Sequence, residues 1–396
     1  GSGKTLVAAA AVLLASRNGV QSALMAPTEI LASQHAAKLA PLLLPLRIAV
    51  EAVFGSQGQR ARGAATGRLA SGEAALAVGT HALLTENVGF ERLGLTIIDE
   101  QHRFGVEQRA RLRAKGPSPH TLHMTATPIP RTLAQSVYAD LDVSTVDELP
   151  PGRTPIVTYA VRASRLGRVY EFVRKHIAFG HQAYIVAPAI DEGESDLTSA
   201  VAEAERLKTD VFADVRLGLL HGRLPAREKD DVMGRFVRGE LDVLVATTVV
   251  EVGVDVANAS VMVVLDAHRY GLAQLHQLRG RVGRGSASSS AILIYPDDAA
   301  ETERLEILTR SNDGFYIAEE DLRLRGPGEF AGMAQSGGAT ELRLADLVAD
   351  IDIYRAAKAA SEEIVGADPL LASPEHAGLR AFLECQPSTR SLLLSS

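Results

Sequence analysis

Gly1-Ser2-Gly3-Lys4-Thr5 opens the chain, and the apolar run Leu6–Leu14 follows it directly. A glycine turn with lysine and threonine that enters a helix is the second half of the P-loop pattern G-x-x-x-x-G-K-[ST]. In such a loop, backbone N–H groups and the helix dipole bind phosphate. We therefore expect all five residues to bind a nucleotide, with Lys4 at the β- and γ-phosphates and Thr5 as a Mg²⁺ ligand. Gly-Ser is also a common cloning remnant, so the P-loop interpretation needs support from a second element of the sequence.

The second element is Thr96–His102, which reads TIIDEQH. β-Branched apolar residues that end in two acids predict the carboxyl end of a buried strand, where open α/β sheets bind ligands. Asp99 is a candidate to hold Mg²⁺ through water, and Glu100 a candidate to polarise the attacking water. Adjacent acids alone more often mark a solvated loop. Together with the glycine-lysine-threonine turn, they predict the Walker A and Walker B elements of an ATPase.

Short apolar runs alternate with helical patterns along most of the chain, which predicts two tandem doubly wound parallel sheets of the α/β class. The Leu149–Arg153 segment (LPPGR) interrupts the pattern, because Pro-Pro-Gly ends helices and strands alike. We therefore predict domains at 1–150 and 151–300, followed by a helical hairpin and loop region at 301–396. The expected strands are Ser22–Ala26, Ala74–Val78, Leu95–Asp99, Thr121–Thr125, Ile156–Ala160, Ala183–Ala187, Val215–Leu220, Val243–Thr247, Met262–Leu265 and Ala291–Tyr295.

The composition is that of an ordinary globular protein: 396 residues, of which 46% are hydrophobic and 22% charged. The only cysteine, Cys385, excludes a disulfide framework and a cysteine-based zinc site. The apolar run Leu6–Ala15 is too short to span a membrane and predicts a buried helix. The net charge of −7 argues against general coating by nucleic acid, so a DNA partner would follow a local basic path. We expect a cytoplasmic protein.

The acid pair continues as DEQHRFGVEQR over residues 99–109 and resembles motif II of superfamily 2 helicases, in the form typical of the RecG family. The Thr125–Thr132 segment (TATPIPRT) resembles motif III, which couples the nucleotide state to DNA binding. Met25–Glu29 (MAPTE) and Val78–Leu84 (VGTHALL) resemble motifs Ia and Ib, which lie along the tracked strand. The resemblance implies that DNA binding or its coupling to ATP involves these residues: Thr28, Thr80, His102, Thr125 and Thr127.

The second half of the chain carries the remaining helicase motifs in order. Tyr184–Pro188 resembles motif IV, and Leu220–Arg223 (LHGR) matches the segment that follows it. Val245–Asp255 (VATTVVEVGVD) resembles motif V, which implies DNA contacts by Thr247 and Thr248 and nucleotide contacts by Gly253 and Asp255.

Gln277–Arg284 (QLRGRVGR) resembles motif VI, and the resemblance adds Gln277 to the nucleotide pocket. Arg281 and Arg284 are three residues apart, about one helical turn, so both guanidinium groups are expected to reach the transferring phosphoryl group across a cleft. A basic surface helix is the plainer interpretation of this segment. Gly280 and Gly283 argue against it, because glycine weakens helices.

Two families share the Asp-Glu-x-His-Arg-Phe-Gly signature: RecG and the transcription-repair coupling factor. Residues 312–322 (NDGFYIAEEDL), followed by Arg325 and then Gly326–Gly328 (GPG), resemble the RecG translocation motif, and Gln101 also favours RecG. The resemblance implies two RecA-like domains and a monomeric, nucleoid-associated ATP- and Mg²⁺-dependent helicase. Such an enzyme reverses replication forks and migrates Holliday junctions in recombination and repair.

RecG proteins also carry an N-terminal wedge domain, so the chain is expected to be a motor fragment that starts inside Walker A. Two alternatives stay open: a coupling-factor-like duplex translocase, and a catalytically silent fragment that keeps the fold. ATPase measurements with and without branched DNA would separate the silent fragment from a motor. The sequence before Gly1 would separate the two families.

Overall fold

The computed structural model describes residues 3–126, 141–146, 154–188, 201–247, 254, 256–285, 287–299, 302–325 and 350–384. The chain forms two compact units, Gly1–Pro128 with Ser144–Asp321 and Ile129–Val143 with Leu322–Ser396. The first unit holds both sheets, so compactness alone does not divide the two predicted α/β domains. The boundaries at 150 and 300 stay predictions.

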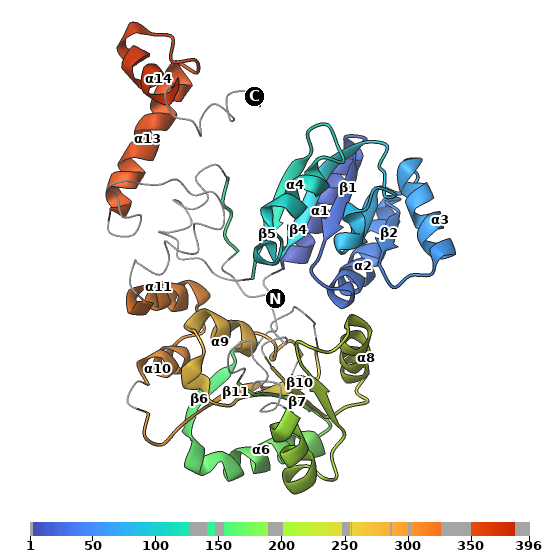
Figure 1. The fold of residues 1–396 in the computed structure, drawn as a ribbon, viewed down its shortest axis with the longest axis vertical. Helices are drawn as coiled ribbons and strands as arrows, with labels where there is room; N and C mark the ends of the chain where they lie inside the picture. The colour runs from blue at the N-terminus through green and yellow to red at the C-terminus, as the bar shows by residue number, and fades with distance from the viewer. Residues whose placement is uncertain are drawn as a thin grey trace. The chain divides into compact units, whose positions relative to one another are not determined.

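The first sheet has five parallel strands in the order β2-β3-β1-β4-β5 (Figure 1). The strands are β1 (Gln21–Met25), β2 (Val50–Val53), β3 (Leu76–Gly79), β4 (Leu93–Asp99) and β5 (His120–Met124). Four of them confirm predicted strands with slightly shifted ends. The sequence prediction missed β2, because this short strand (VEAV) includes a charged residue and most of it is only half-buried.

Helices cover both faces of the first sheet, as a doubly wound sheet requires. They are α1 (Lys4–Arg17), α2 (Glu29–Leu43), α3 (Gln59–Ala70) and α4 (Val106–Arg113), with short turns η1 (Leu44–Leu46), η2 (His81–Leu84) and η3 (Gln101–Arg103). Alternate strand residues point to opposite faces. Leu24 and Ile97 pack with α1 and α2 in one core cluster, whereas Met25 and Ile98 pack with α3 and α4 in another.

The first helix is less buried than the sequence predicted. Helix α1 covers the expected run, but its Leu6 and Leu14 side chains are each 66% exposed. Ala8 and Val12 are fully buried. A helix against one face of a sheet buries a single stripe, so an apolar run alone does not give the extent of burial.

The second sheet has six parallel strands in the order β6-β11-β10-β7-β9-β8 (Figure 1). They are β6 (Val157–Arg162), β7 (Gln182–Val186), β8 (Leu217–Leu220), β9 (Val243–Ala246), β10 (Ala259–Val264) and β11 (Ser290–Tyr295), and they confirm all six predictions. The helices and turns around them are η4 (Ala163–Arg165), α6 (Leu166–Ala178), η5 (Leu207–Val211), α8 (Ala226–Val237), η7 (Ala267–Arg269), α9 (Leu272–Arg279), α10 (Glu303–Arg310) and α11 (Gly314–Arg325). Helix α6 packs on one face, and Phe236 of α8 packs against Tyr184 with the rings tilted by 60° and their centroids 4.9 Å apart.

A buried glutamine begins the central strand of each sheet. The Gln21 amide donates to the carbonyl oxygens of Leu69 and Ala74, at 2.8 and 2.7 Å. At the start of β7, the Gln182 amide donates in the same way to two carbonyl oxygens, those of Phe236 and Leu241. A buried amide needs such partners, because leaving them unmade costs free energy. The two sheets are therefore built alike, which confirms the tandem α/β prediction.

The second compact unit includes α13 (Ile351–Ala367), η9 (Pro374–His376) and α14 (Ala377–Glu384). Helix α13 lies within the region 301–396, for which the sequence predicted helices and a loop. After it, the Asp368 carboxylate accepts hydrogen bonds from the Ala372 and Ser373 amides and lies 2.9 Å from His376 Nδ1. Among the residues described in either unit, no helix combines the length and the apolar character that a membrane crossing needs.

Candidate nucleotide and DNA site

Helix α1 begins at Lys4, directly after a glycine in the left-handed conformation. Gly3 has φ 92° and ψ 9°, and its carbonyl oxygen accepts a hydrogen bond from the Leu6 amide at 2.8 Å. A side chain is strained at this φ, so the turn favours glycine. The sharp entry places Lys4 and the half-buried Thr5 in the first turn of a helix, where amides and dipole favour an anion. Gly1 and Ser2 lie outside the described residues.

The ammonium group of Lys4 lies in the field of side chains from distant parts of the chain. Burial lowers its pKa, and the positive charges of Arg281 and Arg284 lower it further, whereas the carboxylates of Glu100 and Asp99 raise it. Such interactions weaken steeply with distance and screening. Four predicted site residues therefore act on the predicted P-loop lysine.

Asp99 ends β4 and is only 6% exposed. His35, in the middle of α2, places its Nε2 atom 2.7 Å from Asp99 Oδ2. Burial by itself would raise the pKa of Asp99, but the hydrogen bond and charge of His35, with the charge of Lys4, hold that pKa below its usual value. Asp99 is therefore an oriented anion at the end of its strand.

Glu100 adopts the left-handed conformation, with φ 51° and ψ 55°. Its Oε2 atom accepts a hydrogen bond from the Ala126 amide at 3.3 Å, just after β5. A glutamate pays a steric cost in this region of φ and ψ, and such strain concentrates at functional sites. The two adjacent acids thus differ in backbone conformation and in their hydrogen-bond partners.

The prediction that Arg281 and Arg284 share a helical turn is wrong. Helix α9 ends at Arg279, and Gly283 has φ 73°. A Cβ atom on Gly283 would meet Ile156 Cγ1 at 2.8 Å, so both the conformation and the close approach require glycine. Arg281 is only 5% exposed, while Arg284 is half-buried with its Nε donating to the Gly280 carbonyl oxygen at 3.1 Å.

Arg279 is a buried arginine that the sequence did not single out. Its Nη1 donates to the carbonyl oxygens of Leu308 and Ser311, at 2.9 and 2.8 Å, and its Nη2 lies 2.8 Å from His276 Nδ1. Burial lowers its pKa to about 10. These contacts hold the segment around Gln277, which is half-buried in α9, against the end of α10.

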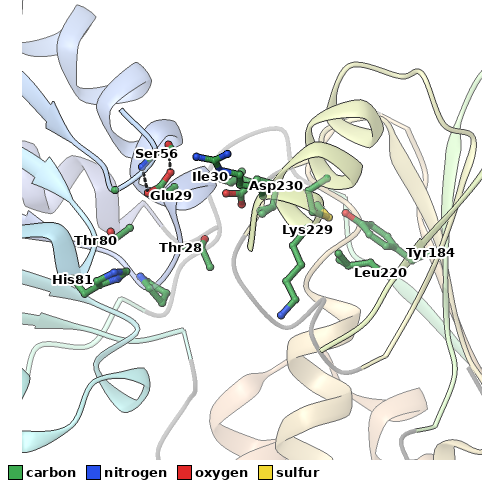
Figure 2. Close-up of a pocket in the computed structure, with 15 residues that line it drawn as sticks. Thr28, Glu29, Ile30, Ser56, Thr80, His81, Tyr184, Leu220, Lys229 and Asp230 are labelled. Atoms are coloured by element: carbon green, nitrogen blue, oxygen red, sulfur yellow. Dashed lines mark hydrogen bonds between the residues drawn. The ribbon is translucent and has the colours of Figure 1, made fainter. Parts of the chain in front are cut away.

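A cavity of about 450 Å³ is lined by both α/β domains (Figure 2). Its lining residues are Pro27, Thr28, Glu29, Ile30, Gly55, Ser56, Thr80, His81, Tyr184, Leu220, Arg227, Lys229, Asp230, Met233 and Val254. Thr28 caps α2, because its hydroxyl accepts from the Leu31 amide at 3.3 Å. Thr80 is 1% exposed and caps η2 in the same manner through the Ala82 amide. The predicted motif Ia and Ib residues therefore meet at one cavity.

Two carboxylates of this cavity come from different domains. Glu29 accepts hydrogen bonds from the amide and hydroxyl of Ser56, as the dashed lines in Figure 2 mark. Burial raises the pKa of Asp230, and the negative charge of Glu29 raises it further, while Lys229 lowers it. The cavity is therefore amphipathic, with charges of both signs among its lining residues. Glu29 belongs to the motif Ia segment that the sequence indicated, whereas sequence reasoning did not find Asp230.

The other predicted DNA residues are only partly described. Thr125 is half-buried directly after β5, and Thr247 is 7% exposed directly after β9. His102 lies in η3 and Arg325 ends α11, but their side chains are outside the described residues. Outside them altogether are Thr127, Thr248, Gly253, Asp255 and the glycine-rich stretch 326–338.

Comparisons with known families match three successive parts of the chain. The DEAD/DEAH box helicase model matches residues 1–136, and the helicase conserved C-terminal domain model matches residues 162–286. A third model, ATP-dependent DNA helicase RecG, domain 3, C-terminal, matches residues 311–385. The fold and the matches together place the chain among the helicase families that are built of two RecA-like domains.

Relatives narrow the class further. The chain is 50% identical over 373 residues to the ATP-dependent DNA helicase RecG of Synechocystis, covering 94% of this chain and 45% of that protein. It is 52% identical over 359 residues to the protein of the same name from Escherichia coli K12, covering 88% and 51%. The chain belongs to the RecG family, and it spans about half the length of these curated relatives.

Solved structures agree with this fold. A structure described as RecG bound to a three-way DNA junction matches with a TM-score of 0.74 and 45% identity, covering 89% of this chain and 46% of that chain. Yeast Dbp5 bound to RNA and ADP BeF3 matches with a TM-score of 0.54 at 17% identity, covering 80% and 81%. The second likeness supports the tandem RecA-like fold alone.

Proposed function

We propose that this chain is the motor of an ATP-dependent DNA helicase that remodels branched DNA, reversing replication forks and migrating Holliday junctions in recombination and repair. The observation that carries the proposal is the convergence on Lys4: carboxylates from the end of β4 and arginines that follow α9 all act on its charge. Hydrolysis that needs both walls of one site can be coupled to the relative motion of two domains.

Lys4, with the glycine turn before it, supplies positive charge for the phosphates of ATP in this proposal. Thr5 and Asp99 offer hydroxyl and carboxylate oxygens, the donors that Mg²⁺ prefers, and the oriented anion at Asp99 fits such an ion. Mg²⁺, when bound, would neutralise phosphate charge. Glu100 would polarise the attacking water. Gln277, Arg281 and Arg284 would come from the opposite wall, with the arginines stabilising charge on the transferring group.

DNA would pass the cavity between motifs Ia and Ib and the second domain. The amino end of α2 supplies backbone amides for phosphates, which gives grip without sequence preference. Thr28, Thr80, Thr125 and Thr247 are the described candidates for this role. We place His102, Thr127, Thr248 and Arg325 with them, and Gly253 and Asp255 with the nucleotide, on the resemblance alone.

The relatives favour RecG over the coupling factor, because those reported above carry the RecG name and a RecG-specific model matches the region after motif VI. We further propose a monomer that works at the nucleoid in the cytoplasm. Three domains at 1–150, 151–300 and 301–396 complete the proposal.

ATP hydrolysis by the full-length gene product, with and without a three-way DNA junction, tests this function. We expect a junction to stimulate hydrolysis, and Lys4→Ala and Arg284→Ala each to reduce the stimulated rate by about 100-fold or more. Lys175→Ala and Arg165→Ala are matched controls, because both residues are exposed on and beside α6. They should stay within about twofold of the wild type.

Thermal unfolding of the same variants separates chemistry from folding. We expect small stability changes for Lys4→Ala and Arg284→Ala, since neither is a core packing group. Near-normal hydrolysis in either variant would contradict its assigned role. A wild-type protein that folds but hydrolyses no ATP with any junction would support the silent-fragment alternative instead.

A further inference from the structure

Helix α2 joins the two predicted sites of the first domain. Its first turn, with Thr28 as cap and Glu29 and Ile30 after it, lines the cavity that we assign to DNA. Seven residues further on, His35 bonds to Asp99 of the predicted nucleotide site. At 1.5 Å per residue, the two points are about 10 Å apart along the helix axis.

The contact between His35 and Asp99 is buried and short. Both side chains are 9% exposed, and the Nε2–Oδ2 distance is 2.7 Å. A hydrogen bond of this kind restricts rotation of a carboxylate about its Cβ–Cγ bond, because turning the group away would break the hydrogen bond. The orientation of Asp99 therefore depends on the position of α2.

The fold itself does not require this pair. In the second domain, Leu265 follows the end of β10 at the position that corresponds to Asp99. Helix α2 is also anchored without His35, since Leu31, Ala32, Leu39 and Leu43 are all buried in the same core cluster. Buried polar pairs often contribute little to stability relative to apolar residues of similar size. A role in orientation explains the pair better than a role in packing.

We propose that His35 is a positioning residue, which orients Asp99 toward the Mg²⁺–nucleotide and transmits DNA contact at the amino end of α2 to that carboxylate. The inference rests on the proposed function, because it needs nucleotide and DNA at the two ends of one helix. Because α2 is continuous from Glu29 through His35, a shift of its first turn also moves the imidazole.

The test compares three variants of the full-length gene product. His35→Leu removes the donor at similar volume, and His35→Gln keeps an N–H donor near the same place. Leu39→Ala is the matched control, because it truncates a fully buried residue of the same helix whose apolar side chain cannot hydrogen-bond to Asp99. The measurements are Mg²⁺-dependent binding of a fluorescent ADP, the ratio of ATPase rates with and without a DNA junction, and thermal unfolding.

We expect His35→Leu to raise the half-saturating Mg²⁺ concentration for ADP binding by about tenfold, the scale seen when a metal ligand loses its supporting partner. The DNA stimulation ratio should fall by a similar factor. His35→Gln should stay within about threefold of the wild type in both measurements. Leu39→Ala should lower the unfolding temperature and leave both measurements unchanged.

Each failure has its own signature. If His35→Leu changes only the unfolding temperature, as Leu39→Ala does, the residue is structural and the inference is overturned. If the Mg²⁺ requirement rises but the stimulation ratio holds, the link to DNA is overturned. A wild type that binds Mg²⁺–ADP but hydrolyses no ATP would overturn the proposed function and the link to DNA. ADP binding by the wild type and the His35 variants would still decide whether His35 orients Asp99.

Discussion

Residues 99–114 of the first domain and 265–280 of the second have nearly the same backbone. They read DEQHRFGVEQRARLRA and LDAHRYGLAQLHQLRG. In each, the second residue is an acid in the left-handed conformation, with φ 51° and ψ 55° at Glu100 and φ 47° and ψ 45° at Asp266. A short 3-10 turn follows, then a glycine and an eight-residue helix, α4 or α9.

The same backbone carries different chemistry in the two regions. Asp99 is an anion bonded to His35, whereas Leu265 holds the corresponding place as a buried apolar residue. At the ends of helices α4 and α9, the buried charge lies in the second region instead. Arg113 is exposed, whereas Arg279 is buried among carbonyl oxygens. The shared geometry therefore belongs to the fold, and function lies in the side chains that break the symmetry.

The largest contrast is expected between the two left-handed acids. Glu100→Gln should reduce DNA-stimulated ATP hydrolysis by about 100-fold or more, because a neutral amide cannot accept a proton from water. Asp266→Asn should change it by less than about threefold, because the buried apolar residue Leu265, not a second acid, precedes it. Steady-state ATPase rates on a DNA junction measure both.

The comparison would break if both substitutions abolished hydrolysis, since the second region would then hold catalytic charge too. Nucleotide binding by Glu100→Gln serves as the control. We expect ADP affinity within about threefold of the wild type, so that the loss belongs to turnover and not to binding.

A second contrast is expected at the ends of helices α4 and α9. Arg279→Met keeps the aliphatic stem but leaves the carbonyl oxygens of Leu308 and Ser311 without their donor. We expect a loss of about 2–4 kcal/mol in the free energy of unfolding. Arg113→Met, at the exposed counterpart, should cost less than about 0.5 kcal/mol. Urea unfolding of both variants tests the contrast, and equal losses would show that burial of Arg279 contributes nothing special.

Much of the fold could be predicted from the sequence, because strand runs and helical patterns recur with the spacing of parallel α/β units. The P-loop lysine and the acid pair were also readable, since each sits at a strand or helix end that its own neighbours mark. Strand β2 was not readable, because only Val50 and Val53 of its four residues favour a strand, while the glutamate and alanine between them are depleted in strands.

The contacts that depend on tertiary structure could not be predicted. His35 lies 64 positions from Asp99, and nothing local distinguishes it from an ordinary buried histidine. Arg279 stands among other arginines of one segment, and only the packing of α10 shows that it points inward. The helical spacing assumed for Arg281 and Arg284 failed because Gly283 permits a left-handed turn that periodicity does not reveal.

The smallest contrast is a pH effect at His276, whose counterpart in the first region is Ala110. Burial and the charge of Arg279 lower the pKa of His276 to about 4, although Asp313 acts in the opposite direction. Its Nδ1 must accept the hydrogen bond from Arg279, because a guanidinium group only donates. The pKa of a histidine in the unfolded chain is near 6.5. Between pH 6.5 and 4, the unfolded chain therefore binds a proton that the folded protein does not bind.

Stability from this site is thus present above pH 6.5 and is lost as the pH falls through that value toward 4. Between pH 7.5 and 4.5, the wild type should lose roughly 2–2.5 kcal/mol more than His276→Gln, whose amide oxygen can still accept from Arg279. Urea unfolding at the two pH values measures the difference. Equal losses in the two proteins would mean that protonation of the imidazole does not lower the free energy of unfolding. The difference between α4 and α9 would then be limited to Arg279.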